Sequence, residues 1–325
     1  MLAFVIRRLA QAFFVVVAMV VLVFFGTYVI GDPVWMMVPG DATQEQVEEV
    51  RRTFGFDQPV YMQFLTFLGD VLRGEFGRSY VHGSSAIGLI LDRMPATLEL
   101  AFAALILAIV IGIPLGLFAG LKPDHPVSRG IMAVSILGFS LPTFWVGLML
   151  IMLFSVMLGW LPATGRGPVI SILGIETSLF SLEGWRHLFL PALNLALLKI
   201  SLVIRLTRSG AREASLQDYV KFARAKGLSP RRIIGVHILK NIMIPIVTVL
   251  GLEFGSLVAF SVVTETIFAW PGMGKLLLEA IQRLDRPLIV GYVMVVVLLF
   301  VTINLIVDIL YSALDPRVRL TGSQS

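Results

Sequence analysis

Long apolar runs recur along this chain, and they constrain its fold more than any other feature of the sequence. The first run, residues 9–30, follows Arg7 and Arg8 and has no charged side chain over 22 positions. At about 1.5 Å per residue, a helix of this length crosses the roughly 30 Å hydrocarbon core of a bilayer. Further runs cover residues 97–120, 130–158, 188–204, 242–262 and 288–311. The pattern predicts an all-α integral membrane protein with about six transmembrane helices.

The composition argues against a soluble domain and excludes several kinds of chemistry. Hydrophobic residues make up 57% of the 325 positions and charged residues only 14%, whereas soluble domains contain about 25% charged residues. Because the chain has no cysteine, disulfides and thiolate metal sites are excluded. Its four histidines are not spaced as metal ligands on a helix, so we expect no metal site. The net charge of +5 is attributed to membrane topology and not to a nucleic-acid partner.

Three of the apolar runs have features that bear on whether each is a single transmembrane span. The first is longer than the roughly 7–15 apolar residues of a signal peptide and lacks a small-residue cleavage site, which favours an uncleaved anchor. Residues 130–158 exceed one span, so we expect Pro142 to kink this run and residues 159–162 to mark its exit. Residues 188–204 form the weakest candidate, because this run is short and contains Lys199.

The distribution of basic residues predicts that both termini lie on the cytoplasmic side of the membrane. With this orientation the cytoplasmic segments hold 15 Lys and Arg but only 4 Asp and Glu, whereas the external segments hold 10 and 14. This asymmetry agrees with the positive-inside rule. The cytoplasmic segments are residues 1–8, 121–129, 205–240 and 312–325, and the external segments are residues 32–93, 159–187 and 263–287.

The basic segment 205–240 contains apolar residues at the spacing of one helical face. This face comprises Leu216, Tyr219, Val220, Ala223 and Gly227. Gly227 is suited to a left-handed cap that ends the helix, and Ser229 and Pro230 are suited to begin a second helix. An exposed apolar face predicts a docking partner. The alternative is a basic amphipathic helix that lies on anionic lipid.

Small residues occupy every fourth position in two of the predicted helices. Such stripes let helix backbones approach closely in lipid, so both helices are predicted to be central and not lipid-facing. Two interpretations remain open: a seam between pore-forming helices, or packing within one subunit. The stripes comprise Ala104, Ala108, Gly112, Gly116 and Gly120 in the second span, and Gly251, Gly255 and Ala259 in the fifth.

Four ionisable residues fall within or at the ends of predicted spans. Glu99 is near the start of the second span, where a helix N-terminus favours an anion, and both Glu99 and Asp308 are interpreted as structural. Lys199 and Glu253 look deeper, where a lone charge costs several kcal/mol, so each should face a partner or a water-filled path. Two hypotheses remain open: Glu253, with Ser256 close to the same face, lines a translocation path, or Lys199 and Glu253 form a structural pair.

Patterns for bond-making chemistry are absent from the sequence. The nearest candidate for a phosphate-binding loop, residues 272–276, lacks the leading glycine and the hydroxyl side chain after Lys275. Neither a G-x-S-x-G elbow nor an H-E-x-x-H zinc motif is present. We therefore expect no catalytic residue, no enzyme activity and no cofactor in this chain.

Residues 218–229, DYVKFARAKGLS, resemble the cytoplasmic signature of the dipeptide, oligopeptide and nickel branch of ABC import permeases. Lys221 and Phe222 depart from the general E-A-A pattern, and the interval from Gly227 to Pro245 is longer than in the general motif; both departures resemble this branch. Similar motifs follow one another along nearly the whole chain. They are GDP at 31–33, FGFDQP at 54–59, GEFGRS at 74–79, PATLEL at 95–100, TETIFAWPGMG at 264–274, and Asn304, Asp308, Tyr311, Pro316 and Arg317.

The resemblance implies a type I ABC importer permease fold in a bacterial-type cytoplasmic (inner) membrane. The chain would divide into residues 1–31 with the first span, an external segment 32–94, a core 95–313 with five spans, and a tail 314–325. Residues 205–240 would then form the coupling loop of the core. Coupling to an ATPase is assigned to Leu216, Tyr219, Ala223, Arg224, Ala225, Lys226, Gly227 and Leu228.

The resemblance also implies partners and solutes. As the first of two different permeases, this chain would form half of a pore with a second homologous permease. Two ABC ATPase subunits, which carry ATP and Mg²⁺, and an external solute-binding protein would complete the system. The expected solutes are di- and oligopeptides, with nickel chelates or glutathione-like compounds as alternatives. An ATP-independent secondary transporter or channel and a membrane scaffold are the interpretations from other classes.

Overall fold

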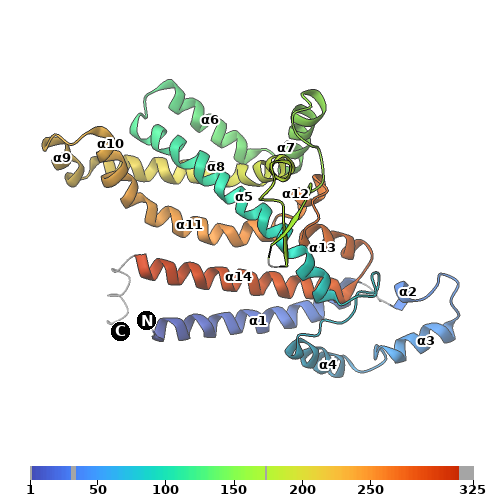
Figure 1. Ribbon diagram of the computed structural model, residues 1–325. Coiled ribbons are helices and arrows are strands. Elements are labelled where there is room, and N and C mark those ends of the chain that lie inside the picture. The colour runs from blue at the N-terminus through green and yellow to red at the C-terminus, as the bar shows by residue number, and fades with distance from the viewer. Residues whose placement is uncertain (1, 31–33, 173, 315–325) are drawn as a thin grey trace. The chain divides into compact units, whose positions relative to one another are not determined.

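Each apolar run predicted to cross the membrane coincides with helical structure. The computed structural model describes the backbone of residues 2–30, 34–172 and 174–314 (Figure 1). Predicted features at residues 31–33 and 315–325, and the side chains of Asp308 and Tyr311, lie outside what is described. The helices that carry the runs are α1 (Leu2–Ile30), α5 (Ala86–Leu121), α6 (Pro126–Ser140) with α7 (Thr143–Leu150) and η1 (Ile151–Met157), α8 (Leu182–Leu216), α10 (Pro230–Arg232) with η2 (Ile233–Leu239) and α11 (Lys240–Ala259), and α14 (Arg286–Leu314).

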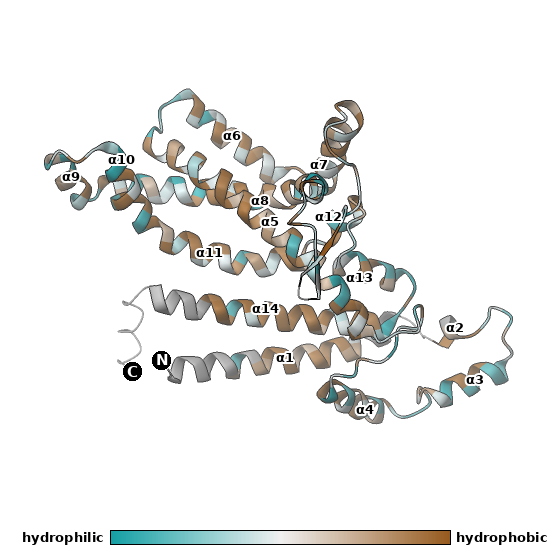
Figure 2. Ribbon diagram, viewed as in Figure 1, coloured by the Kyte–Doolittle hydropathy of each residue, from teal (hydrophilic) through white to brown (hydrophobic). Residues whose placement is uncertain are grey.

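Four of these helices are long and apolar enough to cross a membrane, and Figure 2 shows hydrophobic residues along most of their length. They are Ala86–Leu121, Leu182–Leu216, Pro230–Ala259 and Arg286–Val307. The bent pair formed by α6 and the α7–η1 helix makes a fifth if it counts as one span. In α1, the described apolar stretch Phe13–Gly26 is shorter than a span. An all-α membrane fold is confirmed, whereas the number of six spans stays a prediction.

The third apolar run is broken where the sequence predicts a kink. α6 ends at Ser140 and α7 begins at Thr143, with an angle of 110° between the two helices. Proline disfavours helical geometry in the residue before it, and Leu141 accordingly adopts an extended backbone with ψ of 138°. Pro142 therefore bends the run, and the second half ends at Met157, close to the predicted exit.

Contacts divide the described chain into two compact units. Unit 1 comprises the residues up to Thr97 together with Pro271–Val301, and unit 2 comprises Leu98–Trp270 together with the residues from Thr302 onward. Two of the three boundaries fall inside helices, in α5 and α14, and the third falls in the loop between Trp270 and Pro271. The predicted boundaries at residues 31, 94 and 313 separate membrane-spanning parts of the chain from external and cytoplasmic parts. The two units do not test these boundaries, which stay predictions.

Unit 1 contains helices that the sequence pattern did not locate within residues 32–94. They are α2 (Val34–Met37), α3 (Gln44–Thr53) and α4 (Val60–Arg73). α3 begins with a capping box, in which the Thr43 side chain accepts from the Gln46 N–H and the Gln46 side chain accepts from the Thr43 N–H. The apolar core of this unit joins Val20 of α1 to Val290 and Met294 of α14. α13 (Met273–Gln282) completes the unit.

A buried carboxylate orders the loop between α4 and α5. Asp285 accepts from the Ser79 hydroxyl, from the Tyr80 N–H at 3.2 Å and from the Val81 N–H at 3.4 Å. Burial raises the pKa of Tyr80 to about 12; Arg286 opposes the shift and Asp285 adds to it. The folded protein therefore holds the neutral phenol at a pH where the unfolded chain has lost that proton.

Tyr80→Phe is expected to lose less stability than the wild-type chain between pH 10 and pH 12. The raised pKa makes the contribution of the phenol complete below pH 10 and removes it as the pH rises toward 12, by up to about 2 kcal/mol. Thermal unfolding of both purified chains across this range measures the effect. Parallel curves for the two chains would contradict it.

Unit 2 is arranged around α8, against which α6, α7 and α11 pack. The small-residue stripe of α5 also faces α8, because a Cβ added at Gly112 would meet Val203 and one added at Gly120 would meet Ala211. The stripe of α5 thus serves packing within the chain, one of its two interpretations. In α11, Gly255 is buried and Gly251 faces Val307 of α14.

A small antiparallel hairpin interrupts the helical pattern of unit 2. Its strands are β1 (Ile170–Ile172) and β2 (Ile175–Thr177), with Ile170 opposite Thr177. α12 (Val262–Ile267) follows α11 and packs on α7 and α8. The hairpin was not predicted from the sequence, because two strands of three residues are too short to show a period-2 pattern.

Candidate coupling element and polar sites

The predicted amphipathic helix of the basic segment is α9 (Asp218–Ala225). It begins later than expected: Leu216 is the last residue of α8, and Gln217 separates the two helices with an extended backbone. Gly227 adopts the predicted left-handed conformation, with φ of +74°. Its N–H donates to the Arg224 carbonyl at 2.9 Å, which satisfies an acceptor at the helix end.

The apolar face predicted to dock on a partner is divided in the structure. Val220 and Ala223 are buried within the chain, because α9 packs against α8 and η2. The expectation that both residues are exposed was wrong, since a helix of eight residues needs an anchored face to keep its position. The exposed apolar side chains are Leu216, Tyr219 and Phe222, and the last was not among the predicted coupling residues.

The remaining predicted coupling residues form the exposed end of α9. Arg224, Ala225, Lys226 and Gly227 are exposed, and Leu228 is half-buried. The Lys226 ammonium lies over the Phe222 ring, 4.6 Å from its centroid. On the opposite end, a hydrogen bond from Lys221 at 2.9 Å lowers the pKa of Asp218. This surface therefore combines aromatic groups with unburied cations.

The helix that follows α9 runs without interruption into the membrane. Pro230 occupies its first position and Ser229 precedes it, as predicted, although the Ser229 side chain makes no capping hydrogen bond. The helix continues through η2, a π-helical stretch, to Ala259. The same helix therefore connects α9 to the residues of α11.

Lys199 of α8 and Glu253 of α11 form an ion pair. The Lys199 ammonium also donates to the Ser256 hydroxyl at 2.8 Å, and that hydroxyl lies 2.8 Å from the Glu253 carboxylate. The side chains of Lys199 and Glu253 are 18% and 28% exposed. The sequence left pairing and path lining as alternatives; the structure shows the pair, and its partial exposure is compatible with a path.

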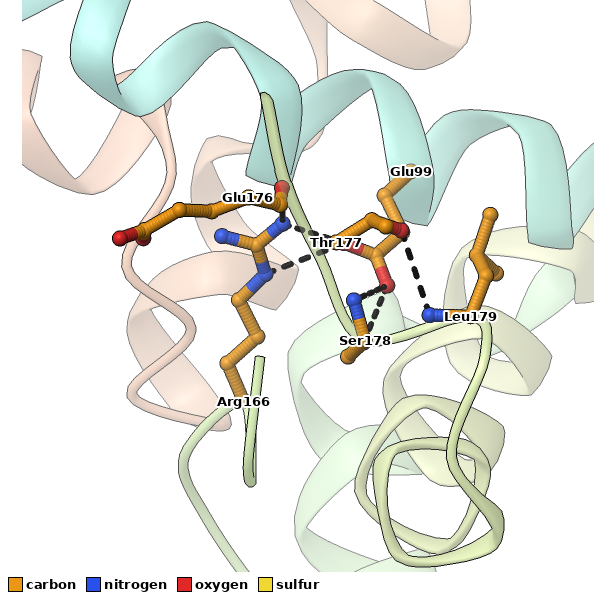
Figure 3. Close-up of polar contacts among 6 residues, drawn as sticks. All are labelled: Glu99, Arg166, Glu176, Thr177, Ser178 and Leu179. Carbon is orange, nitrogen blue, oxygen red and sulfur yellow. Dashed lines mark hydrogen bonds and ion pairs between the residues drawn. The ribbon is translucent and has the colours of Figure 1, made fainter. Parts of the chain in front are cut away.

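Glu99 lies in a buried polar cluster of unit 2 (Figure 3). Its carboxylate accepts from Arg166 at 2.5 Å and 3.0 Å, from the Ser178 N–H at 3.0 Å, and from the Ser178 hydroxyl. Arg166 also donates to the Glu176 carbonyl at 2.7 Å. The expected stabilisation by a helix N-terminus was wrong, because α5 begins at Ala86 and Glu99 lies several turns inside it.

The candidate phosphate loop has a structural use in unit 1. Gly272 precedes α13 in an extended conformation, and the Met273 N–H donates to the Thr97 hydroxyl at 2.8 Å. This N–H is therefore occupied. Among the residues that the structure describes, no group of three or more His, Cys, Asp and Glu side chains is placed to hold a metal ion.

Several helices that are long and apolar enough to cross a membrane, with a short, partly exposed helix between two of them, indicate a multi-pass membrane protein. Residues 112–320 match the family of the binding-protein-dependent transport system inner membrane component, and residues 1–101 match the N-terminal family of the same systems. The chain belongs to this family of inner membrane transport components. It is therefore a permease subunit that works with other components of a binding-protein-dependent system.

Curated relatives are similar over nearly the whole chain. The di/tripeptide transport system permease protein DppB of Pseudomonas aeruginosa (strain UCBPP-PA14) is 40% identical, covering 98% of this chain and 99% of the relative. The dipeptide permease DppB of Escherichia coli (strain K12) is 36% identical with the same coverage. The probable D,D-dipeptide permease DdpB of that strain is 39% identical, covering 95% of each chain.

A solved transporter shows the same core fold. A chain of the inward-facing MetNI methionine ABC transporter matches with a TM-score of 0.53 and 17% sequence identity, over 70% of this chain and 96% of that chain. At this identity the similarity concerns the fold alone. It supports the predicted architecture of an ABC importer permease.

Proposed function

We propose that this chain is one of two different permease subunits of an ATP-driven importer for di- and oligopeptides. The observation that carries the proposal is the 36–40% identity, end to end, with permeases named for di- and tripeptide transport. Nickel chelates and glutathione-like compounds are alternative solutes for the same architecture. Family membership argues against a self-sufficient secondary transporter, a channel or a scaffold.

The proposed mechanism places separate tasks on separate proteins. An external binding protein delivers the peptide near residues 32–93 and 263–287, and the two permeases enclose the pore. Two ATPase subunits bind ATP and Mg²⁺ and hydrolyse ATP, so this chain needs no cofactor and is not an enzyme. With both termini cytoplasmic, α9 faces the ATPases. The uninterrupted helix from Pro230 to Ala259 supports the transfer of α9 movement to the pore.

Purification of the tagged chain from its native membrane in mild detergent tests this assignment. The expected copurifying proteins are a second permease of similar size and one or two proteins with Gly-Lys-Ser/Thr loops. ATP-dependent uptake of dipeptides by the reconstituted complex identifies the solute class. A chain that purifies alone and transports without ATP would overturn the proposal.

Arg224→Glu is expected to abolish ATP-driven uptake while leaving membrane insertion and thermal stability unchanged. The Arg224 side chain is exposed on α9, so charge reversal is expected to act on a docked ATPase and not on the fold. A like-charge or unpaired contact at such an interface costs several kcal/mol. ATPase copurification and uptake provide the measurements. Glu183→Lys, a reversal at an exposed residue of α8, serves as the control, and normal uptake by Arg224→Glu would refute this role.

Glu253→Gln is expected to lower uptake of peptides with a free amino terminus more than that of N-acetylated peptides. The proposal behind it is that the Lys199–Glu253 pair borders the translocation path, supported by the partial exposure of both side chains. Glutamine keeps an acceptor for Lys199 but removes the charge that attracts an ammonium group. Ser256→Ala controls for loss of the local hydrogen bonds. Normal rate and selectivity of Glu253→Gln would leave the pair a purely structural role.

A further inference from the structure

Helix α4 of unit 1 has an apolar surface that its own chain leaves uncovered. Tyr61, Leu65 and Leu72 lie on one side of the helix, within about 40° of one another at 3.6 residues per turn. Leu65 is 57% exposed and Leu72 is 81% exposed. Apolar side chains that are this exposed on a helix of 14 residues indicate that lipid or another protein covers them.

The other two sides of α4 have identified surroundings. Phe64, Phe67 and Val71 pack on the core formed by α1 and α14, with the Phe64 and Phe67 rings 5.1 and 5.5 Å from that of Phe24. A polar stripe faces a hollow of about 470 Å³, which is lined by Gln63, Thr66 and Asp70 among others. The exposed apolar side is therefore adjacent to the packed side and away from the polar hollow.

α4 packs on α14 at residues that lie inside the part of α14 that can cross the membrane, so α4 lies at the depth of the lipid. Val290 and Met294 lie four and eight residues inside the end of α14, about 6 and 12 Å along a helix that can cross the membrane. On α1, the apolar surface continues with the exposed Leu22 and Phe25, and the Phe25 ring stacks against Phe64 at 6.3 Å. Figure 1 shows α4 nearly end-on beside α1, which runs across the view.

We propose that α4 is an interfacial membrane helix whose Tyr61–Leu65–Leu72 side inserts into the leaflet opposite the chain's N-terminus. Its arrangement is that of helices that lie in the plane of a bilayer: an apolar side toward the acyl chains, a polar side toward water, and an aromatic hydroxyl at the headgroup level. The inference depends only on the membrane location of the chain, not on the proposed solute. On this proposal, part of the predicted external segment 32–94 lies in lipid and not in water.

Spin-label accessibility of the full-length chain in vesicles of phosphatidylethanolamine and phosphatidylglycerol tests the proposal. Because the chain has no cysteine, single cysteines at Tyr61, Leu65 and Leu72 accept a nitroxide specifically. Of these three residues, Leu72 has the most exposed side chain, so Leu72→Cys is expected to perturb packing least. Phe14→Cys on the exposed apolar side of α1 and Glu48→Cys on the exposed side of α3 are the matched lipid and water references.

Labels at Leu65 and Leu72 are expected to be accessible to oxygen and protected from a water-soluble nickel complex, as at Phe14. Their ratio of oxygen to nickel accessibility should exceed that at Glu48 several-fold. Accessibility to nickel equal to that at Glu48 would overturn the proposal. Protection from both reagents would overturn it as well, since a second copy of the chain or another protein would then cover α4.

Discussion

Replacing Glu99 by leucine is expected to lower the free energy of unfolding by about 3–5 kcal/mol, because it leaves the buried Arg166 guanidinium without its counter-charge. The side chains of Arg166 and Glu99 are 8% and 3% exposed, so water cannot replace the lost carboxylate. The same change removes the acceptor of the Ser178 N–H. The unfolding midpoint of the purified chain in detergent, with the yield of folded protein, provides the measurement.

A double-mutant cycle separates the unpaired charge from the loss of packing. Glu99→Leu with Arg166→Met is expected to recover about 2 kcal/mol relative to Glu99→Leu alone, since the two residues are directly coupled. Glu183→Gln breaks an exposed ion pair with Arg186 and should cost less than about 1 kcal/mol. Equal effects of Glu99→Leu and Glu183→Gln would show that the cluster in Figure 3 does not stabilise unit 2.

Glu99 illustrates what the sequence predicts and what it does not. Its position at the start of an apolar run predicts a structural role, and the structure gives its carboxylate buried hydrogen-bond partners. The partner, Arg166, is 67 positions away in an irregular segment, where no periodicity brings two residues together. The predicted effect of a helix N-terminus is wrong because residues 32–93 were predicted to be an external segment, whereas α5 begins within this segment at Ala86.

The local structure of the candidate coupling element was predicted more closely, because its signals come from adjacent residues. The helical spacing, the left-handed Gly227 and the proline at the start of the next helix all follow from adjacent residues. The face of α9 that is exposed could not be derived in the same way. Val220 and Tyr219 both belong to the predicted apolar face, and the packing of α9 on α8 and η2 decides which of them is buried.

Gly116→Leu is expected to prevent α5 and α8 from packing and to reduce the yield of folded chain to a small fraction of the wild-type yield. A Cβ at this position would lie 2.6 Å from the Thr207 Cβ and 2.7 Å from the Ile204 carbonyl oxygen. Neither a backbone carbonyl nor a Cβ can move aside without a shift of the helix, and overpacking of this kind costs about 1–3 kcal/mol or more for a single methylene. Leucine adds several such groups.

Gly130→Leu is the matched control, because a Cβ at Gly130 of α6 meets nothing within 4 Å. This variant should fold normally and gain slightly in helix propensity, by less than about 1 kcal/mol. The comparison also separates the two interpretations of the stripe. If Gly116 faced another subunit, Gly116→Leu would fold alone with normal stability and fail only to assemble. Loss of stability in the isolated chain, as expected here, assigns the close approach of these backbones to packing within the subunit.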